Sequence, residues 1–184
     1  MRGLLTLLSS MFLGTTPRDK TWPHEDDIRS FHTMVSLGDV KAVQKALDAN
    51  PALATSTDQF LFQPIHLVCD VDHYPLIPLL LRYGADINAV NEDGHSLLHI
   101  TNDPDLVPLI VAAGADLELR DLQGRTPLLV ALTEPDIYDV VDALLESGSD
   151  PNARDRRGRS VLDYAHADGT DEDLLDLLMD AGAE

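Results

Sequence analysis

GRTPLLVAL, residues 124–132, is the stretch that decides the fold of this 184-residue chain. It opens with a glycine, which is typical of a turn. Thr126 is a residue type that caps helix N-termini, and Pro127 suits the first helical position. Residues 128–132 are all apolar. This order of residues predicts a turn that leads into a short helix beginning at Pro127.

The same pattern recurs along the chain. GRSVLDYA (158–165) lies 34 residues after GRTPLLVA (124–131). GHSLLHIT (94–101) lies 30 residues before it, and LFQPIHLV (61–68) lies 33 residues earlier again, with leucine in the place of the glycine. Self-similarity at such a period is the mark of a repeat architecture. Ser96 and Ser160 are expected to cap helices as Thr126 does.

A second block ends each unit, and a glycine follows its paired leucines. Glycine after a helix supplies a left-handed C-cap. We therefore expect each unit to contain two helices and a connector rich in Asp, Asn and Gly. Short helix pairs cannot bury both apolar faces alone, so such units occur in stacks. The copies are LLLRYGADINA (79–89), LIVAAGADLEL (109–119), ALLESGSDPNA (143–153) and DLLMDAGAE (176–184).

The first unit is the most diverged. SLGDVKAVQKALDANPALA (36–54) keeps an apolar helical pattern after Gly38. Asn50 stands where later units have glycine. Because asparagine tolerates a positive φ better than most residues, we expect that conformation at Asn50.

These motifs resemble the ankyrin repeat family. The family pattern GxTPLHxA appears at residues 124–131, and LLxxGADxNA appears at residues 80–89. The resemblance covers residues 28–184 and implies an all-α solenoid of about five units, each a helix-turn-helix with a β-turn or hairpin connector. The expected units are 28–57, 58–90, 91–120, 121–154 and 155–184, after an N-terminal segment of residues 1–27.

Unit three is shorter than its neighbours. Gly94 precedes Gly114 by 20 residues, whereas Gly124 precedes Gly148 by 24. The sequence predicts a short first helix here, with Asn102 or Asp103 as the cap and Pro104 as the first residue of the second helix.

Composition restricts the functional classes. The net charge is −19, so the chain as a whole repels nucleic acids and anionic membranes, and a neutral or basic protein is the expected partner. Cys69 is the only cysteine, which excludes an intramolecular disulfide and suits a reducing, cytoplasmic compartment. We expect Cys69 to be a buried apolar side chain at the end of a helix.

Motifs for catalysis or metal binding are missing from the sequence. There is no HExxH, no GxSxG and no glycine-rich phosphate loop. DGTDED (168–173) lacks the alternating ligands of a calcium loop and fits the first turn of the last helix. The ankyrin resemblance implies that His66 and His99, at equivalent positions, form structural hydrogen bonds between units. We therefore expect no enzyme activity, no cofactor and no metal.

The resemblance implies a protein-binding surface made of the turn tips and the first helices. Phe60 and Phe62 either anchor a partner or pack against the N-terminal segment and Trp22. The arginines of residues 154–159 are either a solvated, salt-bridged end or part of a bipolar binding face. The candidate binding residues are Phe60, Phe62, Asp72, Tyr74, Glu92, Asp93, His95, Leu122, Arg125, Arg156, Arg157 and Arg159.

Two functional hypotheses are open. In the first, a non-catalytic, monomeric module binds and inhibits or shields a dedicated protein partner, as an immunity or self-protection protein does. In the second, residues 1–20 are a signal or anchor of an exported or membrane-tethered adaptor, because residues 4–13 are mostly apolar. A docking helix or a loose tail is the alternative for the same residues.

Overall fold

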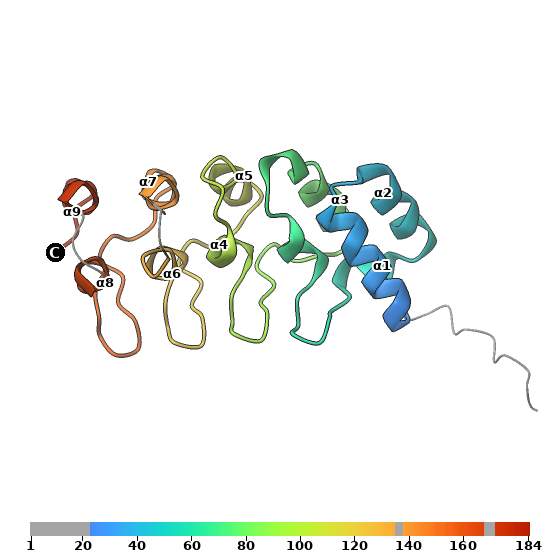
Figure 1. The fold of residues 1–184 in the computed structure, drawn as a ribbon, viewed down its shortest axis with the longest axis horizontal. Coiled ribbons are helices and arrows are strands. Elements are labelled where there is room, and N and C mark those ends of the chain that lie inside the picture. Colours follow the sequence, from blue (N-terminus) through green and yellow to red (C-terminus); the bar gives the residue numbers. More distant parts are fainter. Residues whose placement is uncertain (1–22, 135–137, 168–171) are drawn as a thin grey trace, which may run out of the picture.

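The structure is a computed structural model that describes residues 23–134, 138–167 and 172–184. Helix pairs stand side by side in one row, with the first helices in one layer and the second helices in the other (Figure 1). Loops project from the first-helix edge of the row (Figure 1). Within the described residues the chain forms helices and no sheet, and a single bridge joins Arg154 to Ser160. The all-α solenoid is confirmed.

The helices alternate between the two layers. The first helices are α1 (Glu25–Ser36), η2 (Pro64–Leu67), α4 (Leu97–Ile100), α6 (Pro127–Ala131) and α8 (Val161–Ala167), of which η2 is a 3-10 helix. The second helices are α2 (Val40–Ala49), α3 (Leu76–Arg82), α5 (Val107–Ala112), α7 (Tyr138–Glu146) and α9 (Glu172–Asp180). Two more 3-10 helices, η1 (Pro51–Thr55) and η3 (Val71–His73), lie in the connections.

The repeated motifs mark where the first helices begin and where the second helices end. The Thr126 hydroxyl accepts the Leu129 N–H at 3.4 Å, and Pro127 is the first residue of α6. Ser96 and Ser160 occupy the same capping position. The glycines after α3, α5 and α7 have φ angles of 94°, 98° and 102°, as C-cap glycines require.

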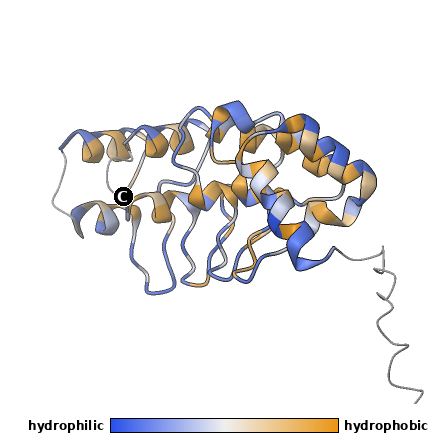
Figure 2. Ribbon diagram, turned by 45° about the vertical axis from the view of Figure 1, so that its right-hand side comes forward, coloured by the Kyte–Doolittle hydropathy of each residue, from blue (hydrophilic) through white to orange (hydrophobic). Residues whose placement is uncertain are grey.

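The core lies between the two helix layers. Apolar faces of both helix layers turn toward each other, while the outer faces of the helices are mainly polar (Figure 2). Leu80, Leu98, Ile110, Leu128 and Leu144 are almost completely buried there. Each such side chain stabilises the fold by roughly 1.5–3 kcal/mol. Neighbouring units are held together because η2 packs on α4, α4 on α6 and α6 on α8.

The two repeat-equivalent histidines form structural hydrogen bonds: His99 bonds to the next unit, as expected, whereas His66 bonds to Ala89 at the end of its own unit. His66 Nδ1 accepts the Gln63 N–H at 2.9 Å, so Nε2 carries the proton and donates to Ala89 O at 2.9 Å. His99 likewise accepts the Ser96 N–H through Nδ1, and its Nε2 bonds to Arg125 O of unit four. Burial lowers the pKa of both rings, and that of His99 falls to about 4. Both histidines are therefore neutral structural groups.

Two expectations about single residues are wrong. Asn50 has φ −148°, because a residue that precedes proline is driven to extended backbone, and its side chain caps η1 by accepting the Ala52 N–H. Cys69 is exposed, because η2 ends at Leu67 and leaves Cys69 in the connection beyond the helix.

The second helix of unit three begins later than expected. α5 begins at Val107, and residues 104–106 form turns. Asp103 caps these turns, accepting the Asp105 N–H at 3.0 Å. Its other carboxylate oxygen accepts the Val71 N–H of unit two at 2.9 Å. The first helix of unit three, α4, has four residues, as does η2 of unit two. Residues 1–22, which include Trp22 and the proposed signal or anchor, and residues 168–171 lie outside the described part.

Candidate protein-binding surface

Four loops project side by side from the first-helix layer (Figure 1). We call them finger two (57–62), finger three (90–95), finger four (120–125) and finger five (154–159). Ten of the twelve candidate binding residues lie on these fingers.

One side chain closes the turn of each finger. Its Oδ1 atom accepts the backbone N–H groups of the residues two and four positions later, at 2.8–3.0 Å. This feature was not predicted from the sequence. It could have been found from an Asp or Asn three residues before the residue in the glycine position of each finger. These side chains are Asp58, Asn91, Asp121 and Asp155.

Backbone hydrogen bonds join each finger to the next. Glu92 N donates to Phe60 O at 3.1 Å, Leu122 N to Asp93 O at 3.1 Å, and Arg156 N to Gln123 O at 3.0 Å. The row of fingers is therefore organised before any partner arrives, which lowers the entropy lost on binding.

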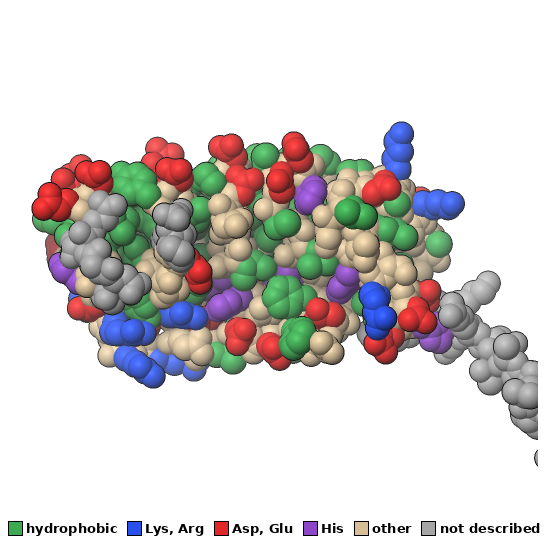
Figure 3. Space-filling model, viewed as in Figure 1, with side chains coloured by type: hydrophobic (Ala, Val, Ile, Leu, Met, Phe, Trp, Pro, Cys, Tyr) green, Lys and Arg blue, Asp and Glu red, His purple; other side chains and the backbone are tan. Residues whose placement is uncertain are grey.

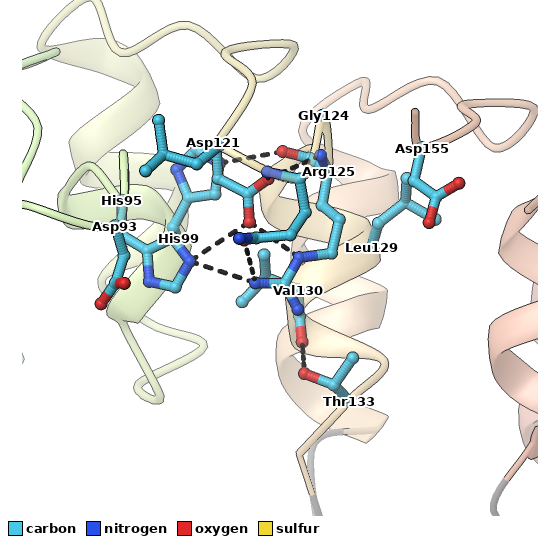
Figure 4. Close-up of polar contacts among 12 residues, drawn as sticks. Asp93, His95, His99, Asp121, Gly124, Arg125, Leu129, Val130, Thr133 and Asp155 are labelled. Atoms are coloured by element: carbon cyan, nitrogen blue, oxygen red, sulfur yellow. Dashed lines mark hydrogen bonds and ion pairs between the residues drawn. The ribbon is translucent and has the colours of Figure 1, made fainter. Parts of the chain in front are cut away.

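Asp121 organises the middle of the row (Figure 4). Its Oδ2 atom accepts Arg125 Nε at 2.7 Å and lies 3.3 Å from His95 Nε2. The His95 ring stacks on the His99 ring with centroids 5.5 Å apart. Burial alone would raise the pKa of Asp121, but the hydrogen bonds from Arg125 outweigh it and lower that pKa. His95 and Arg125 are therefore brought together on one carboxylate.

Asp155 has the same role one unit later. Its Oδ2 accepts Arg159 Nε at 2.9 Å and the Tyr164 hydroxyl at 3.0 Å. The Arg159 guanidinium lies 4.3 Å from the centroid of the Tyr164 ring. Burial opposes ionisation of Asp155, but the hydrogen bonds to its carboxylate lower its pKa to about 2. Arg159 is thus the salt-bridged member of the arginine cluster.

The two candidate phenylalanines lie in different surroundings. Phe60 is 47% exposed at the tip of finger two. Phe62 is half-buried and meets the His66 ring edge-on, with centroids 5.5 Å apart. Two further apolar side chains at the tips are exposed, Leu61 by 50% and Leu122 by 55%. Leu61 has φ 60° in the glycine position and was not among the binding residues predicted from the sequence.

Charge is divided along the row. Fingers two and three contain three acidic residues and no Lys or Arg, whereas fingers four and five contain six arginines and two aspartates. Basic side chains gather below α6 and α8, and acidic side chains line the second-helix edge (Figure 3). The fingers therefore present an acidic half, an exposed apolar set and a basic half.

Asp72 and Tyr74 lie in the connection after η2, away from the finger turns along the chain. This connection contacts the helix–helix connections of other units: Val71 N bonds to Asp103, and His73 packs over Gly38. Asp72 is exposed and Tyr74 is half-buried against the core. The structure does not bring these two residues together with the finger candidates.

A groove of about 830 Å³ opens beside finger two. Ile28, His32 and Thr33 of α1 line one side, and Asp58 and Gln59 line the other.

In the described part of the chain, His, Cys, Asp and Glu side chains form no group suited to hold a metal ion. No helix among the described residues is both long and apolar enough to cross a membrane.

Comparison with known proteins agrees with this architecture. A family model for ankyrin repeats in many copies matches residues 47–101, and a model for the single ankyrin repeat matches residues 123–156. SH3 and multiple ankyrin repeat domains protein 2 of Homo sapiens is 30% identical over 105 residues, 55% of this chain and 6% of that protein. The B-cell lymphoma 3 protein homolog of Mus musculus is 28% identical over 109 residues, 58% of this chain and 24% of that protein. The matched region is thus less than a quarter of either relative. By these two matches, the chain contains ankyrin repeats over residues 47–101 and 123–156.

Proposed function

We propose that this chain is a non-catalytic module that binds a dedicated protein partner through its row of fingers and covers a surface of that partner. Ankyrin repeats indicate a protein–protein interaction module. The observation that supports the proposal most directly is the exposure of Phe60, Leu61 and Leu122 on fingers joined backbone to backbone. Rigidly held, exposed apolar side chains are typical anchors of interfaces.

Phe60 and Leu61 lie on the acidic half of the row, and Leu122 lies on the basic half. Partner side chains buried against them would gain roughly 25 cal/mol for each Å² of apolar surface removed from water. The charged residues around them would then set orientation and association rate more than affinity. The acidic fingers two and three suit a neutral or basic part of the partner.

Affinity capture from the native cell tests this proposal. The chain is compared with a Phe60→Ala/Leu122→Ala variant, and the amount of each co-purifying protein is measured. We expect a protein captured by the parent chain to be reduced by at least about tenfold, since truncating interface anchors costs about 1–2 kcal/mol or more each. A Val71→Ala/Met179→Ala variant is the matched control, because both residues are exposed and apolar but lie outside the fingers.

Thermal melts of all three proteins separate binding from folding. Phe60 and Leu122 are exposed, so the melting temperature is expected to stay close to that of the parent chain. Equal capture by the parent chain and the finger variant would show that the apolar tips are not the anchors. The inhibitory or shielding role is tested next, by measuring the activity of the captured partner with and without the chain.

The second function, an exported or membrane-tethered adaptor, is supported by the apolar residues 4–13. Mass spectrometry of the protein from its native cell would detect removal of a signal, and fractionation would detect an anchor.

We propose that the free chain is monomeric and that the repeat domain comprises residues 28–184. Light scattering during gel filtration tests the first, and limited proteolysis tests the second.

A further inference from the structure

We propose that the arginines of fingers four and five bind an acidic segment of the partner protein. This inference rests on the proposed protein-binding function and names the chemistry of one half of its surface. The six arginines are Arg120, Arg125, Arg154, Arg156, Arg157 and Arg159. With two aspartates, residues 120–125 and 154–159 carry a net charge of +4 in a chain whose net charge is −19.

Backbone carbonyl groups hold several of these guanidinium groups on the fingers. Arg120 Nη1 donates to Gly124 O at 2.7 Å and also to Arg154 O. Arg154 Nη1 donates to Gly158 O at 3.1 Å, and Arg156 Nη1 donates to Leu122 O. A carbonyl oxygen orients a guanidinium group without neutralising its charge. These arginines are therefore positioned and keep donors for a ligand.

The stem of Arg156 is fixed by the turn beneath it. A Cβ atom on Gly124 would lie 2.5 Å from Arg156 Cγ, so the absence of a side chain at Gly124 is what admits this arginine. Arg156 N is bonded to Gln123 O of finger four. The two basic fingers thus form one surface, with the exposed Leu122 beside Arg156.

The acidic residues within these fingers are directed inward. Asp121 is 2% exposed and Asp155 is 7% exposed. Both carboxylates accept finger N–H groups and one arginine each, so Arg125 and Arg159 are partly satisfied. Asp163 of α8 is exposed, but it accepts hydrogen bonds from the Ser160 backbone and hydroxyl. The solvent beyond fingers four and five therefore meets mainly arginine.

Carboxylates match this surface better than a nucleic acid does. Arginine binds a carboxylate through two parallel N–H···O bonds. A nucleic acid strand carries a charge at every nucleotide, so its phosphates would continue onto the acidic fingers two and three. A short acidic stretch of a protein ends within the basic half. The same partner can place neutral or basic residues on fingers two and three. The opposite charges of the two halves would then fix the orientation in which the partner binds.

Fluorescence anisotropy with the full chain tests the inference. The probe is a fluorescein-labelled peptide of alternating Glu and Gly, and the comparison peptide has Gln in place of Glu. We expect the Glu peptide to bind at about 20 mM salt and to weaken strongly at about 200 mM, since exposed charges are screened over about 8–10 Å. An Arg156→Gln/Arg157→Gln variant should bind roughly two- to thirtyfold more weakly, because two exposed ion pairs with the peptide are lost.

A charge-matched variant makes the test specific. Lys41→Gln/Lys45→Gln changes the net charge by the same amount, on exposed residues of α2. It should leave binding within about twofold of the parent chain. Absence of binding at low salt, or equal weakening by both variants, would overturn the inference. Tighter binding of a single-stranded oligothymidine, lost in the finger variant, would also overturn it and assign the surface to phosphate polyanions.

Capture of the native partner separates this inference from the proposed function. If the inference holds, the Arg156→Gln/Arg157→Gln variant captures less of the partner than the lysine variant does. If it captures as much as the parent chain while Phe60→Ala/Leu122→Ala captures less, the acidic-segment inference fails and the protein-binding function stands.

Discussion

Asp121 and Arg125 form an ion pair at the base of finger four, with Asp121 Oδ2 2.7 Å from Arg125 Nε. The other oxygen of the carboxylate accepts the backbone N–H groups of Gln123 and Arg125 at 2.8 Å. One side chain therefore closes the turn and fixes the arginine that the turn presents.

The two parts of this arrangement can be separated by substitution. Asp121→Asn keeps the turn, as Asn91 does in finger three, and loses the ion pair, so we expect a loss of about 1–2 kcal/mol in the free energy of unfolding. Asp121→Ala loses both and should cost about 2–4 kcal/mol. Urea unfolding measures the difference. Equal losses in the two variants would mean that the turn bonds contribute little.

Leu61 is strained, and we expect Leu61→Gly to stabilise the chain. Its φ of 60° is costly for a leucine, whereas the equivalent glycines of fingers three, four and five have φ angles of 82°, 77° and 81°. Relief of about 1–2 kcal/mol is partly offset by the flexibility of glycine in the unfolded chain, which leaves a gain of roughly 0.5–1 kcal/mol. The melting temperature tests this.

The same substitution should weaken partner binding, because Leu61 is half exposed next to Phe60 on finger two. A higher melting temperature with weaker capture would show that this strain is retained for binding. A lower melting temperature would show that the Leu61 side chain contributes more by packing than its backbone costs.

Glu118 occupies a position at which two other units have asparagine. Asn88 accepts the Asp116 N–H at 2.8 Å and donates to Gly114 O at 3.3 Å. Asn152 makes the same two bonds to the final residues of the chain. Glu118 accepts the Asp150 N–H at 2.9 Å, but its carboxylate has no proton to donate to Gly148 O.

We therefore expect Glu118→Asn to raise the free energy of unfolding by about 1 kcal/mol at neutral pH. Burial raises the pKa of Glu118 despite the hydrogen bond from the Asp150 N–H, which lowers it, so the ionised form is less favourable in the folded chain than in the unfolded one. The asparagine removes that cost as well. Urea unfolding is the measurement, with Asn88→Ala as a control that should be less stable than the parent chain. A destabilised Glu118→Asn variant would contradict the repeat equivalence.

Stability should fall between about pH 6.5 and pH 4 because of His99. Burial lowers its folded pKa to about 4 from 6.5. In this window the unfolded chain binds a proton that the folded chain does not, so acid favours unfolding, by roughly 3 kcal/mol when the window has been crossed. His66 acts in the same direction. Stability from Asp155, whose pKa is about 2, is lost only at lower pH.

Urea unfolding at about pH 7, 6 and 5 checks the direction, and proton NMR of the His99 ring measures its pKa. A His99→Gln variant should be less stable at neutral pH but show a shallower pH dependence. Parallel pH dependences of the two proteins would assign the effect to other groups.

The sequence alone determined the local structure of each unit. Thr126 and Pro127 begin a helix and Gly148 ends one through contacts within a few residues, so their recurrence was sufficient to predict the helix pairs and the solenoid. The same short-range reasoning gave a wrong prediction at Asn50. Asn50 was compared with the glycines of later units, but the proline that follows it imposes extended backbone.

Only the tertiary structure decided how the surface residues are used. Arg156 and Arg159 lie in the same loop, yet one is held by a carbonyl group of finger four and the other by Asp155 and Tyr164. Phe60 and Phe62 are two residues apart, yet one faces solvent and the other packs on His66. The Arg156 contact crosses between units, whereas those of Arg159 and Phe62 lie within one unit. A repeat period places these residues in register but does not specify which contacts their side chains make.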